Sequence, residues 1–324
     1  MSQSTPISQP ELAFNRSFLP FIDAVDNIPL DFDFTTLYKL LLPEDERPHG
    51  FIFDRTVPRI PWTTDFVIDD TSKTIRLVAQ DSTTDLGAFI NTAFQRVVDA
   101  IVADGGAFPF VSGRHSEKFR VLGANHLIGI ERFPAPLFGI SSRGAHMTAY
   151  VRDAAGNLRI WVPRRSAHLF TYPGMLDTTV AGGVKVDDSP LECILAEAGE
   201  EASLPADLVR EQARAVGAVT YVHENTAKGA LYPTVLYVYD LELPADVAPT
   251  PMDDEVEEFL LMSITEVIEA MLRGEFKPNC VLVMLDFFIR HGIMTNENCP
   301  EYVEVLTRLR RRLPVPTEPS RAVA

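Results

Sequence analysis

Three carboxylates lie within one helical turn of this chain, at Glu197, Glu200 and Glu201. Offsets of three and four residues place them on one helix face, where like charges cost roughly 0.2–0.5 kcal/mol per pair. Either solvent disperses this repulsion or a bound cation removes it. The paired glycines Gly182 and Gly183 precede the cluster and allow the backbone to approach it closely. Clustered carboxylate oxygens of this kind favour Mg²⁺ or Mn²⁺ over metals that prefer soft ligands.

A helix must position these carboxylates, and three consistent signals mark its start. Ser189 is a suitable N-cap, Pro190 occupies the first helical position, and Glu192 completes a capping box. The apolar residues that repeat along the predicted helix are Leu191, Leu195, Ala198 and Ala202. The helix is expected to end near residues 203–204. A strand, a glycine-rich turn and a carboxylate-bearing helix thus follow one another, which favours a metal site over a solvated acidic helix face.

The composition limits the classes of function. The chain has 324 residues, 46% of them hydrophobic and 23% charged, which suits about two globular domains. Its net charge of −16 argues against nucleic acid and anionic membranes as partners, although a local basic patch could bind a small anion. The three cysteines form no CxxC pair, which suits free thiols in a reducing compartment. The N-terminus lacks the pattern of a secretory signal, so a cytoplasmic location is expected.

Hydrophobic periodicity predicts the order of elements. In the first half it predicts helices over 18–25, 34–42 and 86–104, and a hairpin over 66–79. In the second half it predicts a hairpin over 146–165 and strands over 215–224, 234–243 and 257–263. Predicted helices follow over 264–274, 279–292 and 301–313, of which the second is apolar enough to be buried. The polar, proline-bearing ends 1–17 and 315–324 are expected to be disordered or flexible.

The carboxylate segment resembles a Nudix box, whose pattern is G-x5-E-x7-R-E-U-x-E-E-x-G-U, where U is aliphatic. The matching residues are Gly182, Glu197, Glu200, Glu201 and Leu204, with Asp188 at the first acidic position. Ala196 replaces the box arginine, and Ser203 replaces the last glycine. Further segments over 136–151, 159–167, 171–183 and 274–293 resemble the thiamine-pyrophosphokinase-like Nudix group of fungi and plants.

This resemblance implies a fold and a domain organisation. The expected class is α/β (α+β), with a Nudix α/β/α sandwich around a mixed sheet, preceded by a smaller mixed α/β domain. The predicted boundaries are a disordered N-terminus at 1–17, a companion domain at 18–135, the Nudix domain at 136–314 and a flexible tail at 315–324.

The resemblance also implies the chemistry of the site. Glu197, Glu200 and Glu201 would bind Mg²⁺ or Mn²⁺, and the metal would neutralise phosphate charge and activate a water for hydrolysis of a small-molecule diphosphate. A later acidic segment would supply one more catalytic carboxylate, for which Glu258 is favoured over Glu255 and Glu257. The remaining candidates bind substrate phosphate through side chains or backbone, namely Arg164, Arg165, Gly182 and Gly183. A plain surface pair is the alternative for the two arginines.

Departures from the family pattern bear on the substrate. Leu169, Tyr232 and Leu236 stand where the resembling group places polar or charged residues, which suggests a more apolar pocket wall. The alternative is that these side chains only fill the core. Three accounts remain open. The chain is a diphosphatase for an apolar head group such as a terpenyl or prenyl diphosphate, a diphosphatase for thiamine diphosphate analogues, or a weakened module that binds without efficient turnover. A pyrophosphokinase is disfavoured, because the chain has no GxxxxGK[ST] loop.

Overall fold

A six-stranded mixed sheet organises the second half of the chain. The computed structural model describes residues 14, 16–80, 82–113 and 117–320. The strand order is β10-β11-β7-β8-β12, and the short β9 pairs with β7. The strands are β7 (Ser142–Arg152), β8 (Leu158–Arg165), β9 (Val180–Gly183), β10 (Arg214–Asn225), β11 (Ala230–Glu242) and β12 (Val256–Ser263). Only β7 and β11 run parallel, and the other pairs are antiparallel.

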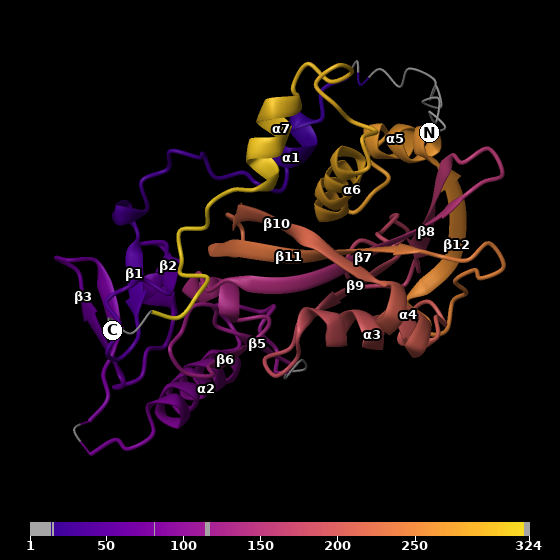
Figure 1. The fold of residues 1–324 in the computed structure, drawn as a ribbon. Coiled ribbons are helices and arrows are strands. Elements are labelled where there is room, and N and C mark those ends of the chain that lie inside the picture. The colour runs from indigo at the N-terminus through magenta and orange to yellow at the C-terminus, as the bar shows by residue number, and fades with distance from the viewer. Residues whose placement is uncertain (1–13, 15, 81, 114–116, 321–324) are drawn as a thin grey trace.

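Helices cover both faces of this sheet (Figure 1). One face carries α3 (Pro190–Glu200) and α4 (Ala206–Gln212), and the other carries α5 (Ile264–Leu272), α6 (Pro278–Arg290) and α7 (Tyr302–Leu309). The apolar helix α6 is buried along its length, with every residue from Cys280 to Phe288 inside the core. The predicted α/β/α sandwich with a mixed sheet is therefore confirmed, as is the predicted burial of this helix.

The N-terminal region forms a smaller mixed unit. Its four-stranded sheet has the order β2-β1-β4-β3, made of β1 (Tyr38–Leu41), β2 (Gly50–Ile52), β3 (Phe66–Asp69) and β4 (Thr74–Leu77). A second hairpin joins β5 (Lys118–Arg120) to β6 (Gly129–Glu131). The helix α2 (Leu86–Asp104) begins at its N-cap Asp85 and ends at Gly105, whose φ of 62° suits glycine. By length and composition α2 could cross a membrane, but its apolar face packs in the core of this unit.

One predicted helix is wrong. The segment 34–42 has helical spacing, yet only Phe34–Thr36 forms a short 3₁₀ turn and β1 follows it. β1 is the second strand of its sheet, antiparallel to β2 and parallel to β4. Leu40 is fully buried there. Pairing on both edges supplies hydrogen bonds and burial that outweigh the weak local helix preference.

Several terminal residues expected to be disordered or flexible are packed. Phe14 is buried against Phe18 and Phe288. At the other end Val315 is buried, and Ser320 donates a hydrogen bond to the side-chain oxygen of Asn125 over 2.7 Å. The C-terminal segment thus crosses onto the N-terminal unit and is not a free tail up to residue 320. Residues 1–13, 15 and 321–324 lie outside the described part of the chain.

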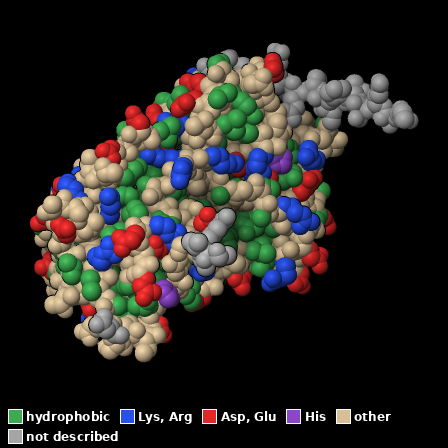
Figure 2. Space-filling view, turned by 60° about the vertical axis from the view of Figure 1, so that its left-hand side comes forward, with side chains coloured by type: hydrophobic (Ala, Val, Ile, Leu, Met, Phe, Trp, Pro, Cys, Tyr) green, Lys and Arg blue, Asp and Glu red, His purple; other side chains and the backbone are tan. Residues whose placement is uncertain are grey.

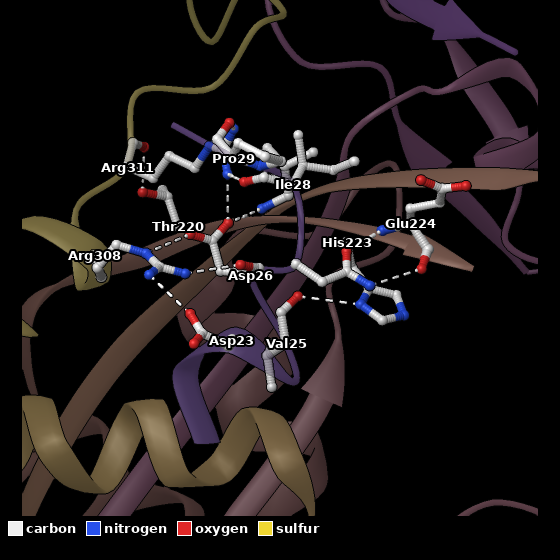
Figure 3. Close-up of polar contacts among 12 residues, drawn as sticks. Asp23, Val25, Asp26, Ile28, Pro29, Thr220, His223, Glu224, Arg308 and Arg311 are labelled. Atoms are coloured by element: carbon white, nitrogen blue, oxygen red, sulfur yellow. Dashed lines mark hydrogen bonds and ion pairs between the residues drawn. The ribbon is translucent and has the colours of Figure 1, made fainter. Parts of the chain in front are cut away.

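A buried ionic cluster, drawn in Figure 3, joins both ends of the chain to β10. Asp26 accepts hydrogen bonds from Arg311 over 2.9 Å and from Arg308 over 3.1 Å. It also accepts one from the backbone N–H of Val222 on β10 over 2.9 Å. The preceding helix α1 (Leu19–Asp23) packs beside α6 and α7. Phe14, Phe18, Ile22 and Val25 therefore contribute to the core of the second domain, whereas the predicted boundary at 18 assigned the last three to the first domain.

The net negative charge is unevenly distributed over the surface. Figure 2 shows Lys and Arg side chains in a row across one face, with acidic side chains scattered around them. A local basic surface thus exists on a chain whose overall charge is −16. This arrangement is compatible with a small anionic ligand, as the composition alone had left open.

Candidate active site

The helix α3 carries the carboxylate cluster and begins as the sequence predicts. The Ser189 side chain accepts from the N–H of Glu192, and the Glu192 carboxylate accepts from the N–H of Ser189. The buried face of the helix differs from the predicted stripe. Ala198 and Ala202 are buried as predicted, whereas Cys193 and Ile194 are buried in place of Leu191 and Leu195, which are only half-buried. The stripe is rotated because β7 and β9 cover the side of the helix that faces the sheet.

The end of α3 depends on a residue in the left-handed region. Ser203 has φ of 53°, a conformation that favours glycine. The backbone N–H of Leu204 then bonds to the carbonyl of Ala198 over 3.0 Å and closes the helix end. The serine thus adopts the backbone conformation that the glycine of the box pattern supplies without steric cost.

Gly182 allows Glu197 to lie directly against the backbone of β9. A Cβ atom at position 182 would lie 2.1 Å from Glu197 Oε1 and 2.6 Å from its Cδ. Any side chain there would displace the Glu197 carboxylate. The glycine therefore permits close contact between the backbone and Glu197 itself, while its contact with a substrate phosphate stays a prediction.

Gly183 has a different neighbour. A Cβ atom at this position would lie 2.8 Å from the ring of Phe119 on β5, in the N-terminal unit. On the same strand, the carbonyl of Lys118 accepts a hydrogen bond from the N–H of Val186 over 2.8 Å. The loop between β9 and α3 is thus fixed by the N-terminal unit, a contribution that periodicity and motifs did not predict.

Glu197 and Glu201 are carboxyls whose charge is poorly compensated. Burial, followed by repulsion from Glu200 and Glu255, raises the pKa of Glu197 to about 7. Burial, followed by repulsion from Glu197, raises the pKa of Glu201 well above its ordinary value. Glu201 accepts a hydrogen bond from the N–H of Ala181 over 3.3 Å. Within the described chain neither carboxylate forms an ion pair with a Lys, Arg or His side chain, so a divalent cation would fit this site.

Glu200 is the exposed member of the cluster. It lies on the same helix as Glu197, close enough that its charge contributes to the raised pKa of that residue. The structure therefore brings together the three glutamates predicted as ligands, two of them buried or half-buried and one open to solvent.

Of the acidic residues 255, 257 and 258, the one whose charge acts on both buried glutamates is Glu255, whereas the sequence favoured Glu258. The charge of Glu255 raises the pKa of both Glu197 and Glu201. Glu258 lies on β12 opposite Arg164 and forms an ion pair with it over 3.1 Å. An irregularity between Val256 and Glu258 separates the two positions. Strand pairing thus assigns Glu258 and Arg164 to each other and leaves Glu255 beside the box glutamates.

A second buried polar cluster centres on Asp177. Its carboxylate pairs with Lys277 over 3.0 Å and with Arg165 over 3.2 Å, and it accepts from the Cys280 thiol. Arg165, predicted to bind phosphate, is thus held by Asp177. The potential metal-binding atoms of His146, Asp177 and Cys280 lie within 4.8 Å of one another. Because two cations already compensate Asp177, another cation there would add uncompensated positive charge, and the box glutamates fit a metal better.

The residues expected to line an apolar pocket have different surroundings. Leu236 is 3% exposed and belongs to the core beneath α6, which corresponds to the core-filling alternative. Tyr232 is half-buried, packs against the N-terminal core, and lies 6.0 Å from the His223 ring. Leu169 is half-buried in the loop between β8 and β9, where Phe170 is 92% exposed.

In comparisons with known proteins, the family model of the NUDIX domain matches residues 142–280 of this chain. The uncharacterized protein YJR142W of Saccharomyces cerevisiae is 34% identical over 322 residues, which cover 93% of this chain and 92% of that protein. The chloroplastic Nudix hydrolase 20 of Arabidopsis thaliana is 38% identical, but the match covers 65% of this chain and 56% of that protein. Among solved structures, DR0079 from Deinococcus radiodurans is 20% identical with a TM-score of 0.32, over 42% of this chain and 75% of that one.

Proposed function

This chain carries a NUDIX domain and belongs to one family with the yeast protein YJR142W, and we propose that it is a Mg²⁺- or Mn²⁺-dependent hydrolase of a small organic diphosphate. The NUDIX domain and the Nudix hydrolase relatives support an enzyme that cleaves a diphosphate (acid anhydride) bond. The observation that carries the metal-dependent part is the pair of uncompensated carboxyls, Glu197 and Glu201, packed against β9.

Glu197 and Glu201 would hold the cation, with Glu200 and Glu255 contributing from the solvent side. When bound, the cation neutralises phosphate charge and lowers the pKa of an attacking water. Because the pKa of Glu197 is raised to about 7 without a cation, binding of a cation there would release a proton at neutral pH. Gly182 and the N–H of Ala181 fix the orientations of Glu197 and Glu201.

The organic group of the substrate is proposed to be apolar, such as a terpenyl or prenyl chain. Its support is the aromatic surroundings near the cation pair of Asp177. The exposed aromatic residues Phe170 and Tyr172 lie in the loop between β8 and β9, directly after Arg165, which pairs with Asp177 over 3.2 Å. Aromatic side chains bind hydrocarbon chains and flat rings alike. A thiamine diphosphate analogue is therefore the second candidate, in keeping with the resemblance to the thiamine-pyrophosphokinase-like group.

A phosphate-release assay with Mg²⁺ tests the proposed function. Glu201→Gln should reduce turnover at least about 100-fold, because it removes one charged ligand from the site. Glu255→Gln should reduce turnover more than Glu258→Gln, which serves as the matched control on the same segment. Full activity in EDTA would contradict metal dependence, and Mg²⁺-dependent binding without phosphate release would indicate a non-catalytic module.

The same assay compares farnesyl diphosphate with thiamine diphosphate. We expect the higher kcat/KM for farnesyl diphosphate, because apolar contact contributes about 25 cal/mol per Å² removed from water. A tenfold preference for the thiamine compound would refute the apolar head group and leave the hydrolase proposal intact. Tyr172→Ala, at an exposed aromatic, should raise KM for the preferred substrate more than it changes kcat.

A further inference from the structure

Arg143 on β7 is a buried cation without hydrogen-bond partners for most of its guanidinium. The residue is 7% exposed, and within the described chain its Nε and Nη1 atoms are buried and make no hydrogen bond. Arg311, which is 5% exposed, shows the usual arrangement, because its guanidinium donates to Asp26, Ile28 and Pro29. Arg143 thus differs from a structural buried arginine.

Strand register places Arg143 two residues from the β7 partner of Gly182. Arg143 and Ala145 are two residues apart on β7, so they share a sheet face and lie about 7 Å apart along the strand. Ala145 pairs with Gly182, the residue that Glu197 packs against. The carbonyl of Arg143 accepts from the N–H of Val184, at the start of the loop that leads into α3.

Among the described residues, no carboxylate forms an ion pair or hydrogen bond with the buried Nε and Nη1 atoms of Arg143. Its guanidinium carbon lies 5.9 Å from the centroid of the Tyr237 ring, a cation–π contact that is worth less than an ion pair. A buried charged donor that is left unpaired is costly, and a bound anion would relieve that cost.

We propose that Arg143 binds an anionic phosphate oxygen of the substrate. This inference rests on the proposed function, because it assumes a diphosphate substrate. Arg143 would bind one of its phosphate groups, and the glutamates would hold the cation. The planar guanidinium suits two parallel hydrogen bonds to one phosphate. Arg143 is thereby a substrate-binding residue, contributed by β7, outside the Nudix box.

Isothermal titration with methylenediphosphonate and Mg²⁺ tests this assignment on the full chain. Arg143→Met should weaken binding of this non-hydrolysable diphosphate about 10- to 100-fold, the range for hydrogen bonds to a charged group. Arg143→Lys should give an intermediate affinity, because ammonium presents one point charge. Mn²⁺ binding without the diphosphonate should be unchanged in Arg143→Met, since the cation is held by other residues.

Thermal unfolding separates this role from a structural one. Without ligand, Arg143→Met should unfold at the wild-type temperature or above, because methionine removes an uncompensated buried charge. The control Arg311→Met should unfold at a clearly lower temperature, because it removes the buried cation that pairs with Asp26 and leaves that buried carboxylate with Arg308. A lowered unfolding temperature in Arg143→Met together with wild-type diphosphonate affinity would overturn the inference.

Failure of the proposed function gives a different pattern. If the wild type binds neither Mn²⁺ nor the diphosphonate, the metal-dependent hydrolase proposal fails. Orthophosphate without metal then decides the role of Arg143. It should raise the unfolding temperature of the wild type but not of Arg143→Met, and an equal response of the two proteins would overturn the assignment.

Discussion

Replacement of Gly182 by alanine tests the contact on which the candidate site is built. The new Cβ would lie 2.1 Å from Glu197 Oε1, and non-bonded Cβ contacts below 3.0 Å are essentially never seen, so the carboxylate must retreat by about 1 Å. Ligand distances in metal sites are held to about 0.2 Å, so this displacement removes Glu197 from the coordination set. The φ angle of Gly182 is not positive, so the backbone itself accepts alanine.

The expected result is a loss of metal affinity without a loss of fold. Mutating groups that only orient metal ligands costs about 10- to 100-fold in affinity or activity, and displacing a ligand should cost at least as much. The unfolding free energy should change little, because two effects oppose each other. Alanine stabilises the protein by about 0.4–1 kcal/mol by restricting the unfolded chain, and the less favourable rotamer of Glu197 destabilises it. Mn²⁺ titration and Mg²⁺-dependent phosphate release measure the first effect, and urea unfolding measures the second.

Gly199 provides the matched control on α3. A Cβ atom there would meet nothing within 4 Å, so Gly199→Ala should stabilise the helix by about 0.5–1 kcal/mol and leave metal affinity unchanged. The double variant of Gly182→Ala and Glu197→Gln should bind metal no more weakly than Glu197→Gln alone, because both changes act on one carboxylate. The reasoning is refuted if Gly182→Ala keeps wild-type affinity while Glu197→Gln loses it.

Three further predictions concern stability. Asp26→Asn should cost about 3–5 kcal/mol in urea unfolding, because it leaves the buried Arg311 unpaired, whereas Asp23→Asn, at an exposed carboxylate, should cost less than about 1 kcal/mol. Burial lowers the pKa of His146 to about 4 in the folded protein. As pH falls below about 6.5, the imidazole is therefore protonated in the unfolded chain but not in the folded one, and the unfolding free energy decreases. His146 should lower the unfolding free energy by about 2 kcal/mol between pH 7 and pH 5. An equal decrease in wild type and His146→Gln would contradict this prediction. Ser203→Gly should raise the unfolding free energy by about 1 kcal/mol by relieving the positive φ, and a decrease would show that the serine side chain matters more.

The sequence by itself determines the local features of this protein. Capping boxes at Ser189 and Ser263 and the positive φ of Gly105 mark helix ends that the structure confirms. Strand alternation and the hairpin turn between β7 and β8 are equally local, since neighbouring residues decide them. The spacing of the box glutamates also follows from the sequence, because residues three and four apart share a helix face.

Only the tertiary structure decides which distant groups meet. Pairing of β12 with β8 assigns Arg164 to Glu258 and leaves Glu255 near the glutamates, although the three acidic residues 255, 257 and 258 are alike in sequence. Pairing on both edges turns a segment with helical spacing into β1. The unpaired state of Arg143 cannot be predicted from its own segment, because it depends on which charges every other strand and loop brings near it. Such contacts join residues far apart in the chain, and their energies depend on burial that no local pattern specifies.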